Sequence, residues 1–430
     1  MNQWKRFEDM VKQIIEKEQI PGAAVAVSQD GETIYQQGFG VKDIKTSEPV
    51  TPETIFGVAS ITKSFTALAI MKLAEEGKLT IQDKVIHYLP ELRFKELEKT
   101  EKMTIHHLLS HTTGLAPLKR KEHLINFNEH IAYLAEQELQ WLGEPGSYLS
   151  YSNDSFLLLG AIIEKITGQS YQSYIQKLIL EPLQMKRTTF HLEQLQQWIN
   201  VSTPYVIQNG ELEACPWPTL GNYAVGGGIR SNVLDLMKYG NMYIKPHERN
   251  IVKADTVAQM YRPVHQIGRN SFYGYGLQTT PAYAGVSLVE HSGNQPGVSS
   301  HFGFVPQKGL AAAVLTNVTG VRAHAIWLAA VNTALGLPLE QQRSIEPTYE
   351  ATEEQLQRLT GTYRSAERGD MHIYLDGKTL KATIDNKTYT LRASDERTLV
   401  IEQLQKPIRF FFKDSNTPWA AFFGLRMLLR

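Results

Sequence analysis

The sequence predicts a mixed α/β fold, in which an antiparallel sheet is flanked by helices, with an inserted helical subdomain and a small all-β, barrel-like domain after it. Strand-like segments occur near both ends of residues 1–336, and a mostly helical stretch of about residues 79–215 separates them. Strands that flank a helical stretch in this way pair into one sheet packed between helices. Residues 337–350 contain two prolines and resemble a linker, and residues 351–430 hold short strand-like runs. We therefore expect a main domain, a linker and an all-β domain.

The first elements are a helix and a hairpin. In residues 4–18, apolar side chains recur at helical spacing among charged and amide side chains, a pattern typical of an amphipathic helix. Residues 22–27 and 33–40 are strand-like. Asp30-Gly31 between them suits a tight hairpin, because both positions tolerate a positive φ.

An apolar helix is predicted after the hairpin, and Gly77 marks its end. At its start, Ser60-Ile61-Thr62-Lys63 places a hydroxyl and an amine one helical turn apart. Residues three apart share one face of a helix, so Ser60 and Lys63 are expected to be neighbours. A serine in front of a helix is more often simply an N-cap, so this motif alone is weak.

Two further motifs change that interpretation. Tyr151-Ser152-Asn153 precedes an apolar helix of about residues 156–166. His291-Ser292-Gly293 closes a strand-like run at residues 286–290 and is followed by Asn294. A serine–lysine pair, a tyrosine with an amide, and a strand edge of small residues form an ordered set that is typical of nucleophilic catalysis.

The remaining segments complete the two domains. Residues 298–305 and 310–315 are strand-like, and a closing helix is expected over residues 321–335. The all-β domain should begin with a short helix and continue with strands separated by turn residues. These elements are predicted at residues 353–359 for the helix, and at residues 371–375, 379–384, 388–391, 399–402 and 408–412 for the strands.

With these motifs the chain resembles the penicillin-recognising serine hydrolases, a family that includes class C β-lactamases, DD-peptidases, D-aminopeptidases and related esterases. The resemblance covers about residues 1–335. The start of the all-β domain, residues 359–363, resembles the lipocalin-like domain that accompanies some members. Further segments that look like the family are Phe56-Gly57-Val58-Ala59, residues 107–115, Gly226-Gly227-Gly228 and Leu315-Thr316-Asn317.

The resemblance implies an acyl-enzyme mechanism with Ser60 as the nucleophile. The residues themselves leave the base open: an ordinary lysine is protonated and an ordinary tyrosine neutral at pH 7, so Lys63 and Tyr151 are expected to titrate as a unit. By resemblance, Tyr151 is the base and later the proton donor, and Lys63 holds the proton network. Asn153 is then expected to orient the substrate amide. Ser292, Gly293 and Asn294 are expected to bind substrate along the strand, with the backbone N–H groups of Ser60 and Asn294 at the oxyanion.

His291 departs from the β-lactamase pattern, in which a lysine normally occupies this strand position. A lysine presents a permanent positive charge to a substrate carboxylate, whereas a histidine with an ordinary pKa near 6.5 is mostly neutral above pH 7. We therefore expect carboxylate binding to be weak and pH-dependent. This favours a peptidase or amidase acting on D-amino-acid-containing peptides or amides. An esterase or class C-like β-lactamase is the alternative, and a penicillin-binding sensor that does not turn over is a third possibility.

Composition restricts the partners. The 44 basic and 44 acidic residues give a formal net charge of zero, so nothing indicates nucleic acid as a partner, and a small molecule or short peptide is the expected substrate. With one cysteine, Cys215, a multi-cysteine zinc site is excluded, and we expect neither a metal nor a cofactor. No signal peptide or membrane span is visible, which favours a cytoplasmic enzyme. The oligomeric state cannot be read from the sequence.

Overall fold

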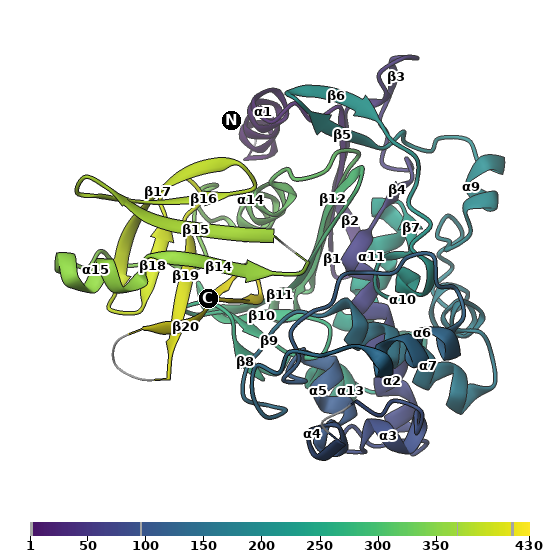
Figure 1. Ribbon diagram of the computed structural model, residues 1–430. Coiled ribbons are helices and arrows are strands. Elements are labelled where there is room, and N and C mark those ends of the chain that lie inside the picture. The colour runs from purple at the N-terminus through teal and green to yellow at the C-terminus, as the bar shows by residue number, and fades with distance from the viewer. Residues whose placement is uncertain (1–2, 95–96, 368, 414–416) are drawn as a thin grey trace.

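The computed structural model describes residues 3–94, 97–367, 369–413 and 417–430. In this part of the chain, a nine-stranded antiparallel sheet carries helices on both faces, and a closed eight-stranded barrel lies beside it (Figure 1). The predicted fold class is confirmed. In their order across the large sheet, the strands are β3 (Glu48–Pro49), β2 (Glu32–Asp43), β1 (Gly22–Gln29), β13 (Leu310–Thr316), β12 (Val298–Val305), β11 (Val286–Gln295), β10 (Gln278–Tyr283), β9 (Phe272–Tyr273) and β8 (His265–Gln266).

The early and late strands of the main domain meet in the middle of this sheet. Strand β1 pairs on one side with β2 and on the other with β13. The β1–β2 turn is the expected one, since Asp30 and Gly31 have φ of +52° and +96°. Strand β11 continues through the His291 motif to Gln295, five residues beyond the predicted run. The motif therefore lies within a paired strand, and not at the end of one.

Helices bury both faces of the sheet, as the alternation along β1 shows. Ala23, Val25 and Val27 face the core formed with α1 (Gln3–Lys17) and α14 (Ala323–Leu335). Ala24 and Ala26 face the core formed with α2 (Thr62–Glu75) and α11 (Val233–Ile244). Small side chains on that second face allow helices to approach the sheet closely.

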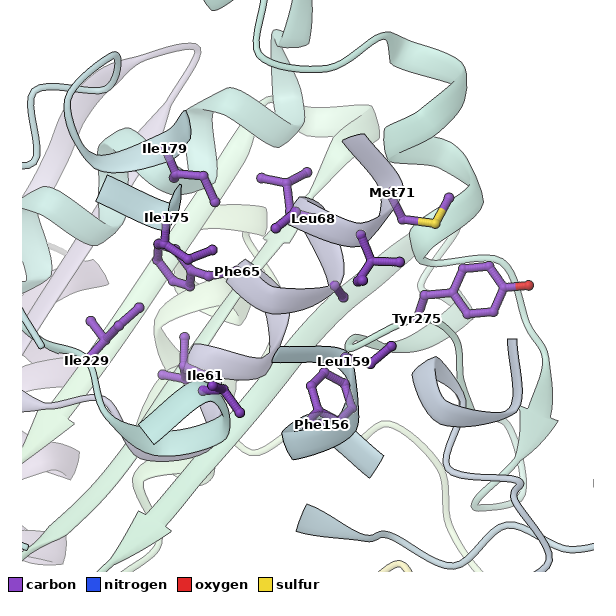
Figure 2. Close-up of a cluster of buried hydrophobic side chains, with 14 of the residues drawn as sticks. Ile61, Phe65, Leu68, Met71, Phe156, Leu159, Ile175, Ile179, Ile229 and Tyr275 are labelled. Atoms are coloured by element: carbon purple, nitrogen blue, oxygen red, sulfur yellow. The ribbon is translucent and has the colours of Figure 1, made fainter. Parts of the chain in front are cut away.

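Helix α2 runs through the centre of the larger core and is apolar on nearly all sides, as expected for a helix buried all round. Figure 2 shows its Phe65, Leu68 and Met71 surrounded by side chains of other segments, among them Phe156 and Ile175. The Phe65 ring stacks on Tyr239 of α11, with 3.7 Å between ring centroids. This packing fixes the start of α2, which carries Lys63 and directly follows the turn that carries Ser60.

The region of about residues 79–215 is helical and irregular, as predicted, and ends in a small hairpin. Its helices are α3 (Val85–Tyr88), α4 (Leu97–Lys102), α5 (Ile105–Leu109), α6 (Phe127–Glu136), α7 (Asn153–Thr167), α8 (Tyr171–Ile175), the π-helical turn η2 (Gln176–Leu180) and α9 (Leu192–Gln197). The hairpin consists of β5 (Tyr205–Gln208) and β6 (Glu211–Ala214). Between this region and the end of the sheet lie η3 (Gly221–Tyr223), α10 (Ala224–Gly227), β7 (Arg230–Ser231), which pairs with β4 (Phe56–Gly57), α12 (Pro246–Arg249) and α13 (Ala254–Met260).

The C-terminal barrel follows α15 (Glu353–Leu359). Its strands are β14 (Gly361–Ser365), β15 (Gly369–Asp376), β16 (Thr379–Ile384), β17 (Lys387–Asp395), β18 (Thr398–Ile401), β19 (Lys406–Phe412), β20 (Pro418–Phe423) and β21 (Arg426–Leu429). The sequence did not predict β14, β20 and β21. For the last two the reason lies in their turn, Gly424-Leu425, where Leu425 has a φ of +68° that leucine rarely adopts, so the usual turn signal is missing.

The barrel packs against the main domain through a shared apolar cluster. Tyr151 and Tyr273 on one side and Phe422 and Met427 on the other are buried together in it. Tyr148 lies edge-on to Trp419 with 5.3 Å between ring centroids. Among the aromatic residues of the barrel, Phe410 and Phe423 lie in its core, whereas Phe422 lies in this interface. The interface matters because it includes a predicted site residue.

A buried charge pair holds residues 337–350, the segment between the main domain and the barrel. Arg343 donates from Nε to Glu290 Oε1 at 2.6 Å and from Nη2 to Oε2 of the same side chain. His301 Nε2 also donates to Glu290, at 2.7 Å. Burial opposes ionisation of Glu290, but Arg343 and His301 outweigh it and keep the Glu290 pKa below its ordinary value. The pair joins the segment to β11, the strand that carries the His291 motif.

Candidate active site

Ser60 lies on a single 3-10 turn, η1 (Ala59–Ile61), directly before α2. Ala59 has a φ of +48°, and such strained backbone clusters at functional sites. The turn is held by Ser300, whose hydroxyl donates to Val58 O at 2.7 Å. A Cβ at Gly293 would lie 2.3 Å from that same carbonyl oxygen, so only glycine lets β11 come this close to the serine.

The Lys63 amine is buried and surrounded by acceptors. Its Nζ donates to Asn153 Oδ1 and to Gly226 O, each at 2.9 Å, and lies 3.3 Å from Ser60 Oγ. Burial lowers the Lys63 pKa well below its ordinary value, and the charges of Arg120 and Arg426 lower it further. A neutral amine has two N–H donors and one lone pair. In its neutral form, the amine would use both donors on Asn153 and Gly226, and its lone pair would face the serine hydroxyl.

Gly226 is required by this arrangement. It lies in α10, and a Cβ at this position would be 2.9 Å from Lys63 Nζ and 3.3 Å from Cε. Its carbonyl oxygen is also one of the two acceptors of the Lys63 amine. The glycine triplet therefore shapes the lysine site, with no role in binding a phosphate.

The Tyr151 hydroxyl also lies near the Ser60 side chain. The side chain is buried, and within the described part of the chain its oxygen has no hydrogen-bond partner of normal geometry. Burial raises the Tyr151 pKa, while the Ser60 hydroxyl and the Arg426 charge lower it to a smaller extent. Lys63 Nζ lies 4.9 Å from the centroid of the ring. In the free protein, these directions favour a neutral phenol beside a neutral amine.

A relay of rings positions the Tyr151 segment. The backbone N–H of Ser152 donates to His111 Nδ1 at 3.1 Å, which places the His111 proton on Nε2, 3.2 Å from the Tyr273 oxygen. Tyr273 then donates to His291 Nε2 at 3.1 Å, and His291 Nδ1 donates to Ser292 O at 2.6 Å. Each histidine is thus assigned one tautomer. The His111 ring packs on the Tyr151 ring with 4.2 Å between centroids.

The ordinary pKa near 6.5 that the sequence suggested for His291 does not hold in the folded chain. Burial and the nearby charge of Lys63 lower the His291 pKa to about 3. The ring is neutral over the physiological range, and its Nε2 accepts from Tyr273. The sequence suggested an ordinary pKa, because nothing in the motif shows that the His291 ring is buried and bonded to Tyr273.

Ser292, Gly293 and Asn294 point alternately to the two faces of β11, as neighbouring residues of a strand do. Gly293 faces the Ser60 turn, whereas Ser292 and Asn294 are exposed. Since neighbouring positions on a strand point to opposite faces, Ser292 and Asn294 are placed to contribute through their backbone. This agrees with the predicted use of the Asn294 N–H, which remains a prediction.

Residues 7–335 match the model of the Beta-lactamase family. The chain belongs to the β-lactamase family. A solved structure described as an octameric penicillin-binding protein homologue from Pyrococcus abyssi is 31% identical, covers 99% of both chains and superposes with a TM-score of 0.74. That match extends the similarity through the barrel.

Two curated proteins are also similar to this chain. Penicillin-binding protein 4* of Bacillus subtilis (strain 168) is 29% identical over 321 residues, which are 70% of this chain and 68% of that protein. Protein flp of Staphylococcus aureus (strain MW2) is 33% identical over 189 residues, 43% of this chain. The matched part spans only 38% of flp. Membership supports the prediction of a serine hydrolase.

In this β-lactamase-family chain, the structure brings Ser60, Lys63, Tyr151 and Asn153 together, with His291 behind Tyr273. Sequence reasoning missed the residues that complete the site. The sequence signalled some of these residues only through the similarity of residues 107–115 and of the glycine triplet to the family. Nothing in the barrel sequence pointed to the others. The residues missed are His111 in its positioning role, Arg120, Gly226 as the lysine acceptor, Tyr273, Glu367 and Arg426.

The described residues include no group of three or more His, Cys, Asp or Glu side chains arranged to hold a metal ion. In the same part of the chain, no helix is both long and apolar enough to span a membrane. Cys215 is partly buried and forms no disulfide.

Proposed function

We propose that this protein is a serine hydrolase that acts through an acyl-enzyme on Ser60, with D-amino-acid-containing peptides or amides as its substrates. The observation that carries the proposal is the Lys63 amine: it is buried, donates to Asn153 and Gly226, and lies 3.3 Å from Ser60 Oγ. Its lowered pKa supports a neutral base that accepts the serine proton.

The reaction begins when Lys63 takes the proton of Ser60 and Oγ attacks the carbonyl carbon. The oxyanion receives the backbone N–H groups of Ser60 and Asn294. Tyr151 donates its phenolic proton to the leaving nitrogen, and the Lys63 ammonium returns a proton to Tyr151. A water then releases the acyl group. The raised pKa of Tyr151 favours a neutral phenol that donates its proton, whereas the family resemblance made Tyr151 first the base and later the proton donor.

The neutral His291 supports peptides or amides over penicillins. A lysine at this position would offer a fixed charge to a β-lactam carboxylate, and a histidine with a pKa of about 3 does not. The choice between peptides or amides and penicillins thus depends on other groups around the site.

Intact-protein mass after mixing with benzylpenicillin and with D-alanyl-p-nitroanilide tests the proposal, with Ser60→Ala as the control. We expect the protein to hydrolyse the anilide. We also expect a covalent adduct that forms only when Ser60 is present. A penicillin adduct that clears quickly would favour a β-lactamase. An adduct that persists without anilide turnover would favour a penicillin-binding sensor. No covalent labelling of Ser60 by either compound or by a fluorophosphonate would refute the mechanism.

A further inference from the structure

Two charged side chains of the barrel reach the candidate active site. Glu367, in the connection between β14 and β15, accepts a hydrogen bond from Asn153 Nδ2 at 2.5 Å through Oε1. Arg426, the first residue of β21, donates from Nε to Glu367 Oε2 at 2.7 Å. Asn153 contacts Lys63 through its other amide atom, Oδ1. A single side chain therefore separates Glu367 from the amine that lies beside the nucleophile.

The docking of the barrel fixes both side chains in place. The backbone N–H of Tyr151 donates to Leu425 O at 2.7 Å, and that of Met427 donates to Ser150 Oγ at 3.2 Å. Only 9% of the Glu367 side chain and 14% of the Arg426 side chain are exposed. A buried ion pair adds little net stability, because desolvation offsets the attraction. Their position at the nucleophile therefore indicates a role other than holding the barrel.

Glu367 has acceptor capacity to spare. An ionised carboxylate offers about four lone-pair positions. Among the described contacts, the bonds from Asn153 and Arg426 use two of them. A ligand group with several N–H donors and a positive charge matches what remains.

We propose that Glu367 determines specificity by binding the α-ammonium group of the residue whose carbonyl carbon Ser60 attacks. The inference rests on the proposed function and narrows it to aminoacyl amides and peptides with a free amino terminus. The α-nitrogen lies about 2.5 Å from the carbonyl carbon, because only Cα separates them. Once the carbonyl is at Ser60, this nitrogen faces the side chains around Lys63, where Asn153 and Glu367 lie.

The charges around the site support this selection. The charges of Arg120 and Arg426 lower the Lys63 pKa, whereas that of Glu367 raises it. A substrate ammonium would be repelled by the two guanidinium groups unless it met the carboxylate. An N-acylated substrate would instead place a neutral amide nitrogen beside the Glu367 carboxylate, with one N–H donor and no positive charge to balance it.

The test compares D-alanyl-p-nitroanilide with its N-acetyl derivative in the full-length protein, in Glu367→Gln and in Asp370→Asn. Glutamine keeps the shape and the amide partner but removes the charge. Asp370 is a matched control, because it is an exposed barrel carboxylate, 58% exposed, whose partner is Arg364. A hydrogen bond to a charged group contributes enough to predict a loss of at least about tenfold.

We expect the parent to prefer the free amine, and we expect Glu367→Gln to lose at least about tenfold more in kcat/KM for that substrate than for the N-acetyl one. In the parent, kcat/KM for the free amine should also fall above about pH 8, as the ammonium deprotonates, and this fall should be absent in Glu367→Gln. Asp370→Asn should match the parent in both respects.

Equal losses on both substrates in Glu367→Gln would overturn the proposal and indicate that the residue only holds the barrel. A parent that labels at Ser60 with a fluorophosphonate but hydrolyses the N-acetyl substrate equally well would overturn the Glu367 assignment alone. Failure of Ser60 to label, with neither substrate hydrolysed, would overturn the proposed function as well.

Discussion

Replacing Gly226 with alanine tests whether the position of the Lys63 amine controls acylation. Gly226 has helical backbone in α10, which alanine adopts readily. The added Cβ would lie 2.9 Å from Lys63 Nζ and 3.3 Å from Cε. Ordinary contact requires about 3.5 to 4.0 Å, so the amine must move by roughly 0.5 to 1 Å.

That displacement acts directly on the proton transfer. Lys63 Nζ is held by Asn153 Oδ1 and by the carbonyl of Gly226 itself, so moving it alters its 3.3 Å separation from Ser60 Oγ. A misplacement of about 1 Å costs on the order of a hundredfold in rate. We therefore expect the rate of acylation to fall about a hundredfold, or about 2.7 kcal/mol in activation free energy.

Gly227→Ala is the matched control in the same helix. Its Cβ would meet Gln295 Oε1 at 3.4 Å and Leu220 Cδ1 at 3.6 Å, which are ordinary contacts away from the lysine. The assay is the second-order rate of Ser60 labelling by a fluorophosphonate, followed by intact-protein mass, together with thermal unfolding of each variant. A Gly226→Ala protein that is folded and labels within about threefold of the parent would refute the reasoning.

Three further predictions concern buried charge. Burial raises the Asp154 pKa to about 6, above the value of about 3.9 in an unfolded chain, so ionisation of Asp154 opposes folding as the pH rises. At about pH 8, Asp154→Asn should therefore be more stable than the parent by up to about 3 kcal/mol in the free energy of unfolding. Below about pH 4 the two proteins should be equally stable. Equal urea midpoints for the two proteins at both pH values would contradict this. Arg343→Ala leaves Glu290 buried without its main partner and should lower the free energy of unfolding by about 3 to 5 kcal/mol, with part recovered in the Glu290→Gln, Arg343→Met double variant. Because the His291 pKa is about 3, His291→Asn should reduce kcat/KM but leave the acid limb of its pH profile unchanged between about pH 5.5 and pH 8.5. If the acid limb disappears in this variant, His291 titrates in that range.

Most of the sheet and of the helix that carries the nucleophile could be predicted, because local patterns determine them. The turn at Asp30-Gly31 and the apolar run after Lys63 depend on residues close in sequence. The barrel strands β20 and β21 escaped prediction because Leu425 adopts a left-handed conformation only in the context of the folded barrel.

In the candidate site as well, local sequence predicts some neighbours and not others. Ser60 and Lys63 are three residues apart, so helical geometry alone makes them neighbours. Glu367 lies 214 residues from Asn153, and Tyr273 lies 162 residues from His111, and no local pattern links such pairs. The burial that lowers the pKa of Lys63 and of His291 is likewise set by side chains from many segments.

The sequence by itself determined the family, the antiparallel sheet with its helices, and the serine, lysine and tyrosine of the candidate site, because helical and strand periodicity and short motifs are properties of neighbouring residues. Only the tertiary structure decided that the Lys63 and His291 pKa values are lowered and that the barrel places Glu367 and Arg426 beside Asn153. Desolvation and charge–charge interaction depend on distances through space, and the folding of distant segments onto one another sets those distances.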